Sequence, residues 1–377
     1  MPASPTPASS PADQPPSARP KLTWQGYLLR WLGGALLATL LMWAGSWNFL
    51  NSTVAYTWDD SLQQYVPEPG TTIRWRREGW ATTTIGKHSI TSLPDVTQID
   101  RPMVALWGDS YVEALQVADQ QKPAQQVTRI WNSQHDMPLV CVGIGGAGRS
   151  IADYWWLMPR YEQLIVLRAH YILVPNMGDV MPDGKYFRTQ PHFELTPLRK
   201  TPEALGLRPI VRDLRLEFLW EAVKNVRTNS DGKTRRRLRF RPGPVDDATP
   251  AERSDELPAA PLQAWVDLLD ALRERTDLPV TFIYAPHTPW IDGREVRTDD
   301  RDAALAATFS QMCRQRGIGF IDLAEPFVGL YRESGRFPRG FYHGGAASGH
   351  LNELGHRLVA EAICQDLREN VDAIHAD

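Results

Sequence analysis

The sequence has little cysteine and no strong charge of either sign. Only three of its 377 residues are cysteines, and no Cys-x-x-Cys spacing occurs, so neither a zinc site nor a disulfide framework is indicated. The net charge of −3 gives no general case for nucleic acid or an anionic membrane surface as a partner. No internal repeat is visible. A hydrophobic content of 42% and a charged content of 23% predict a globular protein with a substantial core.

Long apolar runs are also scarce, and the one exception is near the N-terminus. The chain carries no charge from Trp31 to Trp47, and apolar neighbours extend this run into a predicted transmembrane helix over residues 27–48. Basic residues precede the run and acidic residues follow it, which favours a cytoplasmic N-terminus. We therefore expect a single-pass inner-membrane protein with its globular part in the periplasm or outside the cell. A cleaved signal peptide is the alternative, and the long polar tail ahead of the run disfavours it.

The remaining chain divides by composition into a tail, an entry segment and one large domain. Residues 1–22 are rich in proline, alanine and serine and are predicted to be disordered. Residues 51–100 form a β-rich entry segment, in which β-branched and aromatic residues at 71–76 and 80–85 flank Glu78-Gly79 and predict a hairpin. The domain spans 101–372, with an insertion at about 182–258.

Within the domain, short apolar runs alternate with segments of helical period. Strands separated by helices favour a parallel sheet that is covered on both faces. The sequence thus predicts an α/β fold, a three-layer αβα sandwich around a mostly parallel sheet of about five strands. The expected strands are 103–107, 138–142, 171–175, 279–284 and 318–322, and the expected helices include 111–134, 151–167, 261–275, 302–316 and a last amphipathic helix from Leu354 to Val371.

The first strand leads into Gly108-Asp109-Ser110, where a tight turn precedes a helix. This arrangement places the Ser110 hydroxyl at the carboxyl edge of the sheet, where open α/β folds bind their ligands. The free N–H groups of a helix N-terminus can stabilise a negatively charged oxygen there. We expect Asp109 to hold the turn together.

Two further stretches follow the second and third predicted strands. The glycine-rich turn at 143–148 exposes backbone N–H groups, and its spacing is not the Gly-x-Gly-x-x-Gly of a dinucleotide site. Asn176, after the third strand, is either an amide donor to an oxyanion or an ordinary turn residue.

Histidines cluster near the last helix. His350 lies just ahead of that helix, where the helix dipole disfavours the imidazolium and keeps a base neutral. His343, His350 and His356 do not have a standard zinc spacing, so we expect no metal.

The four blocks together resemble the SGNH (GDSL-type) hydrolase family, in order and rough spacing, over about residues 101–372. The stretch from Gly108 to Val117 and the preceding hairpin further resemble membrane-anchored bacterial members. The resemblance implies that Ser110 is the nucleophile and His350 the general base. It also implies an oxyanion hole made of the N–H of Ser110, the N–H of Gly146 and the side chain of Asn176, and it implies no cofactor.

Two positions depart from the family pattern. The family has an Asp two or three residues before its histidine, and these positions are Ser348 and Ala347 here. Either another acceptor, such as a backbone carbonyl, orients the imidazole, or the activity is reduced or absent. In addition, the family's asparagine aligns either with Asn176 or with Gly178, which precedes Asp179.

The resemblance implies a membrane-anchored O-acyl esterase or O-acetyltransferase. Its expected substrate is acylated cell-surface polysaccharide, with envelope-polysaccharide assembly proteins as candidate partners and no nucleic acid. A lipase, lysophospholipase or thioesterase is the alternative within enzymes, with the insertion at 182–258 as a lipid-facing lid. A pseudo-enzyme that binds glycan is the alternative outside them.

Overall fold

The computed structural model describes residues 23–49, 54–76, 78–180, 259–342 and 345–370, with three isolated residues between 210 and 216. The predicted disordered tail and nearly all of the predicted insertion lie outside the described residues. Both therefore stay predictions.

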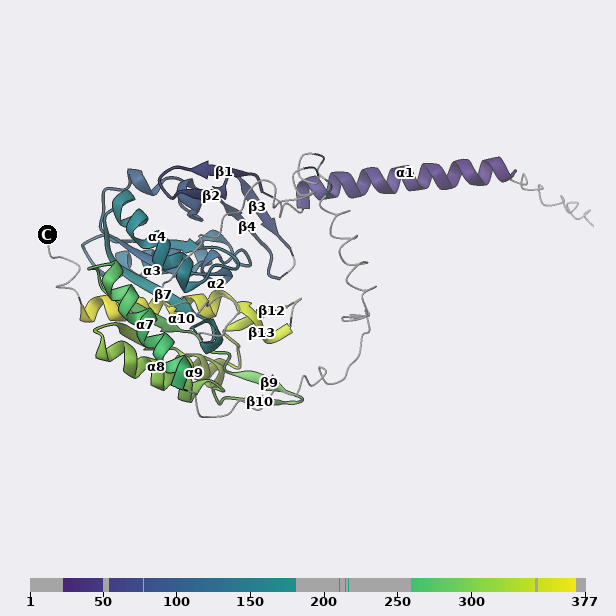
Figure 1. Ribbon diagram of the computed structural model, residues 1–377. Coiled ribbons are helices and arrows are strands. Elements are labelled where there is room, and N and C mark those ends of the chain that lie inside the picture. The colour runs from purple at the N-terminus through teal and green to yellow at the C-terminus, as the bar shows by residue number, and fades with distance from the viewer. Residues whose placement is uncertain are drawn as a thin grey trace, which may run out of the picture.

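A five-stranded parallel sheet forms the centre of the protein (Figure 1). Its order is β11-β8-β7-β5-β6, and every neighbouring pair is parallel. The predicted αβα sandwich is thus confirmed, and each predicted strand overlaps an observed one. The strands are β5 (Met103–Gly108), β6 (Val140–Gly145), β7 (Leu167–Val174), β8 (Val280–Tyr284) and β11 (Gly319–Asp322).

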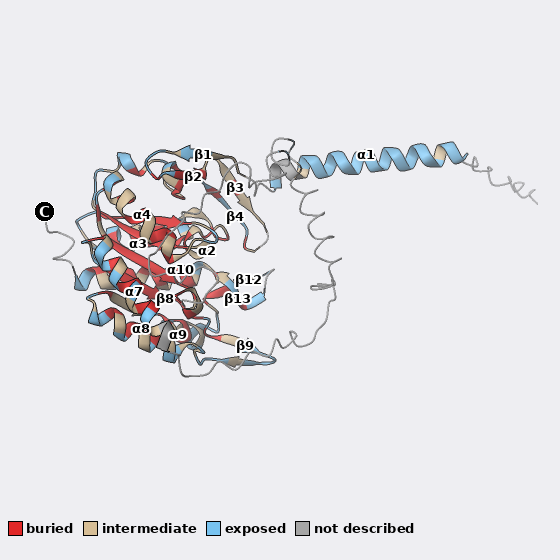
Figure 2. Ribbon diagram, in the orientation of Figure 1, coloured by how far each residue is buried: buried red, intermediate tan, exposed pale blue. Residues whose placement is uncertain are grey.

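Helices cover both faces of this sheet, and each face has its own apolar core. One core is built with α4 (Ile151–Leu164), α7 (Ala259–Arg275) and α8 (Ala303–Gln315). The other is built with α3 (Pro123–Gln134), α9 (Ala324–Ser334) and α10 (Glu353–Glu369). The buried residues follow the sheet and the inner faces of these helices (Figure 2).

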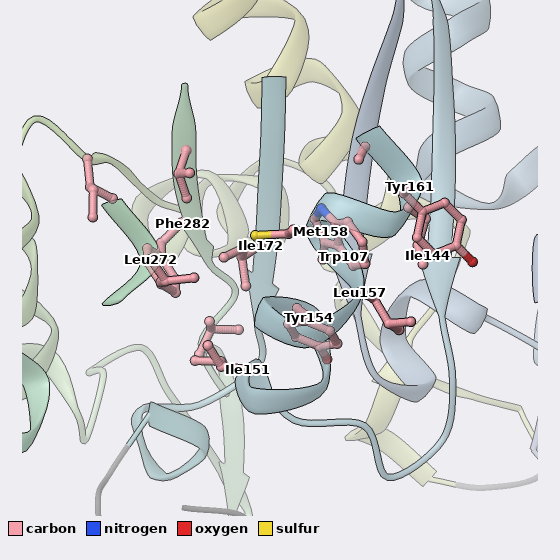
Figure 3. Packing of buried hydrophobic residues seen from close by; sticks show 14 of the residues in the cluster. Trp107, Ile144, Ile151, Tyr154, Leu157, Met158, Tyr161, Ile172, Leu272 and Phe282 are labelled. Carbon is pink, nitrogen blue, oxygen red and sulfur yellow. The ribbon is translucent and has the colours of Figure 1, made fainter. Parts of the chain in front are cut away.

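The central strand β5 shows why the sequence predicts this layout. Successive side chains of a strand point to opposite faces. Accordingly Ala105 and Trp107 enter the core on the α4 side, and Val104 and Leu106 enter the other core. Trp107 packs edge-on against Tyr161 with ring centroids 5.4 Å apart, in the cluster that Figure 3 shows. A strand buried on both faces is apolar throughout, as this one is.

The entry segment packs onto the domain rather than standing apart from it. It contains β1 (Tyr56–Asp59) paired with β2 (Gln64–Pro67), the predicted hairpin β3 (Thr72–Trp75) with β4 (Ala81–Thr84), and the 3₁₀ turns η1 (Lys87–Ser89) and η2 (Val96–Gln98). Four of its residues are fully buried in the core on the α4 side: Leu62, Val66, Ile90 and Val96. The entry segment therefore has a fixed position against the sandwich.

The N-terminal helix α1 (Trp24–Phe49) extends away from the sandwich (Figures 1 and 2). It is long and apolar enough over Trp24–Gly45 to cross a membrane, and none of that stretch is buried. Its length and composition suit a membrane span or a signal sequence.

The structure also corrects the expected elements at several places. The predicted helix over 111–134 is divided into the short α2 (Ser110–Glu113), the 3₁₀ turn η3 (Asp119–Gln121) and α3. His350 does lie just ahead of the last helix, as expected, but the residues around it form a strand of a hairpin. The sequence pattern missed β9 (Trp290–Asp292), β10 (Glu295–Arg297), β12 (Arg339–Phe341), β13 (Gly345–Leu351) and the 3₁₀ turn η4 (Met177–Val180).

Candidate active site

Ser110 begins α2 directly after β5, at the carboxyl edge of the sheet. Asp109 caps this helix, because its Oδ1 accepts the backbone N–H of Tyr111 at 2.9 Å. Burial raises the pKa of the Asp109 carboxyl. The helix lasts one turn and ends at Ala114 in the left-handed conformation, at φ 49°. The tight turn expected around Asp109 is therefore present, and it presents the serine at the sheet edge.

His350 is in contact with this serine. Its Nε2 lies 2.9 Å from the Ser110 Oγ, although 240 positions separate the two residues. The histidine is carried by β13, which pairs with β12 in a hairpin at the same edge of the sheet. The ring of Tyr111 packs against the imidazole at a centroid distance of 4.9 Å. The structure thus brings together the nucleophile and the base that the resemblance implied.

The imidazole is oriented by a carboxylate that the sequence reasoning did not identify. Glu78 lies in the turn between β3 and β4, and its Oε2 is 2.6 Å from the Nδ1 of His350. Its other oxygen accepts the backbone N–H of His350 at 2.8 Å. The sequence left open that another acceptor replaces the missing Asp, and that acceptor is the carboxylate of Glu78 rather than a backbone carbonyl. The only signal in the sequence was the hairpin itself, whose turn contains Glu78-Gly79.

Glycine is required next to the histidine. Gly349 has a φ of 75°, which side-chain-bearing residues rarely adopt. A Cβ at this position would also collide with the carboxylate of Glu78. The missing side chain leaves room for the carboxylate to reach the backbone and the ring of His350 together.

Two of the three expected oxyanion donors, Gly146 and Asn176, follow the strands β6 and β7 on either side of β5, and both are engaged within the protein. The N–H of Gly146, after β6, donates to the carbonyl of Asp109 at 3.2 Å. The amide of Asn176, after β7, donates to the carboxylate of Asp179 at 2.9 Å. The Oδ1 of Asn176 would lie 2.7 Å from a Cβ built on Gly178. The side chain of Asn176 therefore occupies the space that a side chain at position 178 would need.

A pocket of about 190 Å³ opens beside Ser110. It lies between the turn that leads into α4 and the end of β7, and Arg149, Tyr154 and Asp179 are among its lining residues. Burial and the nearby Asp109 raise the pKa of Asp179 to about 6. The pocket is thus small, and both charged and aromatic side chains line it beside the serine hydroxyl.

The other histidines and the cysteines lie elsewhere. His343 is outside the described residues. His356, on α10, is buried, and burial lowers its pKa to about 3. Cys141, Cys313 and Cys364 are all buried and free. Among the described residues, no group of three histidine, cysteine or carboxylate side chains is placed to hold a metal.

Comparison with known proteins gives distant similarities only. No family model and no curated protein matches the chain. Among solved structures, a lipase/acylhydrolase from Enterococcus faecalis is similar at a TM-score of 0.36 and 12% identity, over 72% of this chain and 96% of that one. An acetyl xylan esterase is similar at 0.34 and 12%, over 70% and 99%. A phospholipase A1 from Streptomyces albidoflavus is similar at 0.33 and 9%, over 71% and 98%. Because these values are low, the function proposed below rests on the residues of the site.

Proposed function

We propose that this chain is a serine ester hydrolase or acyltransferase of the SGNH type, with Ser110 as nucleophile, His350 as general base and Glu78 as the acid that orients the base. One observation carries the proposal: a continuous chain of contacts from the Ser110 Oγ through both nitrogens of His350 to the carboxylate of Glu78. A hydroxyl, an imidazole and a carboxylate in this order make up the triad of acyl-transfer enzymes.

The chemistry follows from the positions of these groups. Ser110 Oγ attacks the ester carbonyl while His350 Nε2 takes its proton, and Glu78 holds the Nδ1 proton and stabilises the imidazolium. The tetrahedral intermediate then expels the alcohol, which receives the proton from His350, and leaves an acyl-enzyme on Ser110. Water or an acceptor hydroxyl then attacks the acyl-enzyme and gives its proton to His350. The acyl group leaves with it, and the Ser110 Oγ receives the proton back. We assign stabilisation of the oxyanion to the N–H of Ser110, to the amide of Asn176 and to the N–H of Gly146, which would have to leave the carbonyl of Asp109 to take this role.

The substrate class is the less direct part of the proposal. We propose an O-acyl ester, carried by cell-surface polysaccharide, and an envelope location on the periplasmic side of the inner membrane. The apolar helix α1 supports anchoring, because an anchor would keep the enzyme near envelope glycans. The small pocket beside Ser110 favours a short acyl group over a long lipid chain. A lipase, lysophospholipase or thioesterase remains the alternative substrate class.

The test is hydrolysis of p-nitrophenyl acetate by the full chain in detergent, beside Ser110→Ala and His350→Ala. Turnover by the wild type that both variants lose would support the proposal. Labelling by a fluorophosphonate probe gives a second readout, since the probe reacts with an activated serine and should not label Ser110→Ala. A folded wild-type protein that neither hydrolyses the ester nor takes up the probe would overturn the proposal and favour a glycan-binding pseudo-enzyme.

The substrate class needs its own comparison. Acetylated polysaccharide, p-nitrophenyl octanoate and a lysophospholipid would be offered to the same wild-type protein. Release of acetate from the polysaccharide supports the proposed class, whereas faster turnover of the octanoate or the lipid favours the alternative. Transfer is distinguished from hydrolysis by mass spectrometry of an added acceptor sugar.

A further inference from the structure

Arg339 is a buried cation in the middle of the site that the proposed chemistry does not use. Its side chain is 1% exposed and lies at the start of β12. The guanidinium of an arginine carries five N–H groups, and here each of the five has an acceptor. The acceptors are the hydroxyl of Tyr111 and the carbonyls of Gly349, Pro175, Ala285 and Pro286.

These acceptors belong to separate parts of the sheet edge. Pro175 follows β7, and Ala285 and Pro286 follow β8. Gly349 directly precedes the proposed base, and Tyr111 directly follows the proposed nucleophile. The guanidinium therefore connects two strand ends of the sheet with α2 and β13, the elements that carry Ser110 and His350.

Tyr111 closes this connection. Its hydroxyl accepts from Arg339 Nη1 at 2.8 Å and donates to the carbonyl of Gly349 at 3.1 Å. Burial raises the pKa of the Tyr111 phenol, so that the hydroxyl keeps the proton it donates. The ring of the same residue packs against the imidazole of His350.

We propose that Tyr111 and Arg339 act as positioning residues, which hold the β12–β13 hairpin so that His350 stays at hydrogen-bonding distance from Ser110. The inference rests on the proposed function, because it assigns these residues a role in the same reaction. Neither residue exchanges a proton with the substrate. They act by fixing the distance between Tyr111, which follows the nucleophile, and Gly349, which precedes the base.

The physical reason is the position of His350 on a hairpin. The hairpin β12–β13 lies outside the five-stranded sheet, and in the described part of the chain its two strands pair with each other and with no other strand. A catalytic pair misplaced by about 1 Å can lose about 100-fold in rate. Three hydrogen bonds from the buried guanidinium of Arg339 tie this hairpin to the ends of β7 and β8. A fourth bond reaches Tyr111 on α2, and the fifth reaches Gly349 within the hairpin itself.

The test is Tyr111→Phe, which removes the bridging hydroxyl and keeps the ring over His350. Tyr171→Phe is the matched control, because Tyr171 also donates a part-buried hydrogen bond, to Asp366 at 2.8 Å, away from the site. We expect Tyr111→Phe to lower kcat about 10- to 100-fold with little change in KM. Both variants should lower Tm similarly, and Tyr171→Phe should keep its kcat.

A double-mutant cycle with Glu78→Gln distinguishes a positioning role of Tyr111 from a general loss of structure. If Tyr111 acts through His350, adding Tyr111→Phe to Glu78→Gln should lower kcat by much less than it does alone. Equal and independent losses, or a kcat of Tyr111→Phe within twofold of wild type, would overturn the inference.

A readout that does not need turnover keeps the inference separate from the proposed function. In protein labelled with ¹⁵N-histidine, the Nδ1 proton of His350 should give a downfield resonance from its bond to Glu78. We expect Tyr111→Phe and Arg339→Lys to shift or broaden this resonance and Tyr171→Phe to leave it unchanged. An unchanged resonance in all three variants overturns the positioning role, even if the wild type proves to hydrolyse no ester.

Discussion

The carboxylate of Glu78 lies 2.6 Å from the Nδ1 of His350, and 272 positions of sequence separate the two residues. The acid comes from the entry segment, and the base comes from a hairpin near the end of the domain. A carboxylate that holds both the ring and the backbone N–H of one histidine fixes the orientation of that ring. The absence of an Asp shortly before His350 is therefore compensated in space.

Glu78→Gln should lower kcat strongly, because an amide can donate to Nδ1 and favour the wrong tautomer. The corresponding change in a serine protease costs about 10⁴-fold, and we expect a loss of about 10²- to 10⁴-fold with little change in KM. Steady-state hydrolysis of p-nitrophenyl acetate measures it. Glu68→Gln, in an exposed turn of the same segment, is the matched control and should keep full activity. A Glu78→Gln enzyme with wild-type kcat would show that the contact has no role in turnover.

Gly349→Ala should abolish most activity, because the new Cβ would displace the Glu78 carboxylate. The control is Gly335→Ala, whose φ of 69° is equally unfavourable but whose Cβ would meet open space. Backbone strain alone costs about 1–2 kcal/mol of folding free energy in each variant. Denaturant unfolding should thus show similar losses of stability, while kcat falls about 100-fold or more only in Gly349→Ala. Parallel losses of kcat in the two variants would contradict this explanation.

Asp179→Asn should change how stability depends on pH. Burial and Asp109 raise the pKa of Asp179 to about 6, above the value of about 3.9 for an unfolded aspartate. The folded state therefore holds this proton more tightly, and its stabilising effect is lost as pH rises from about 4 to about 6. Urea unfolding at pH 4 and pH 7 should show the variant gaining stability relative to wild type at the higher pH.

The control for that comparison is Asp267→Asn, the same chemical change at an exposed position of α7. If the difference in unfolding free energy between wild type and Asp179→Asn is the same at both pH values, the carboxyl does not titrate in this range.

The predicted topology places residues 1–22 in the cytoplasm and the sandwich on the other side of the membrane. All three native cysteines are buried, so a membrane-impermeant maleimide should report on introduced ones. In right-side-out spheroplasts, we expect labelling of Ser133→Cys, at an exposed position of α3, and no labelling of Ser10→Cys until lysis. The reverse pattern would contradict the predicted orientation, and recovery of unanchored protein lacking its N-terminus would indicate a cleaved signal.

The sandwich was predictable because its inner strands are largely apolar, as burial on both faces requires. The hairpin of His350 was not, since β13 consists largely of glycine, alanine and serine, which carry little strand signal. Glu78 was missed for a different reason. Its partner is remote in sequence, and a Glu-Gly pair between two strand-like runs is what an ordinary hairpin turn contains. Ser110, His350, Gly146 and Asn176 were singled out because their blocks resemble a family pattern, and their roles stay predictions.

The position of Glu78 also makes the entry segment part of the proposed catalytic unit, in addition to its share of the core. A recombination event or an engineered fusion that begins at residue 101 would transfer every strand and helix of the sandwich, yet would leave the acid behind. Such a domain would have the Ser110-His350 pair only as a dyad, and it would also lack Leu62, Val66, Ile90 and Val96, which are buried in the core on the α4 side. A transfer of the domain to a protein with a different membrane anchor would therefore have to include the β3–β4 hairpin, because the hairpin belongs to the proposed enzyme and not to the linker.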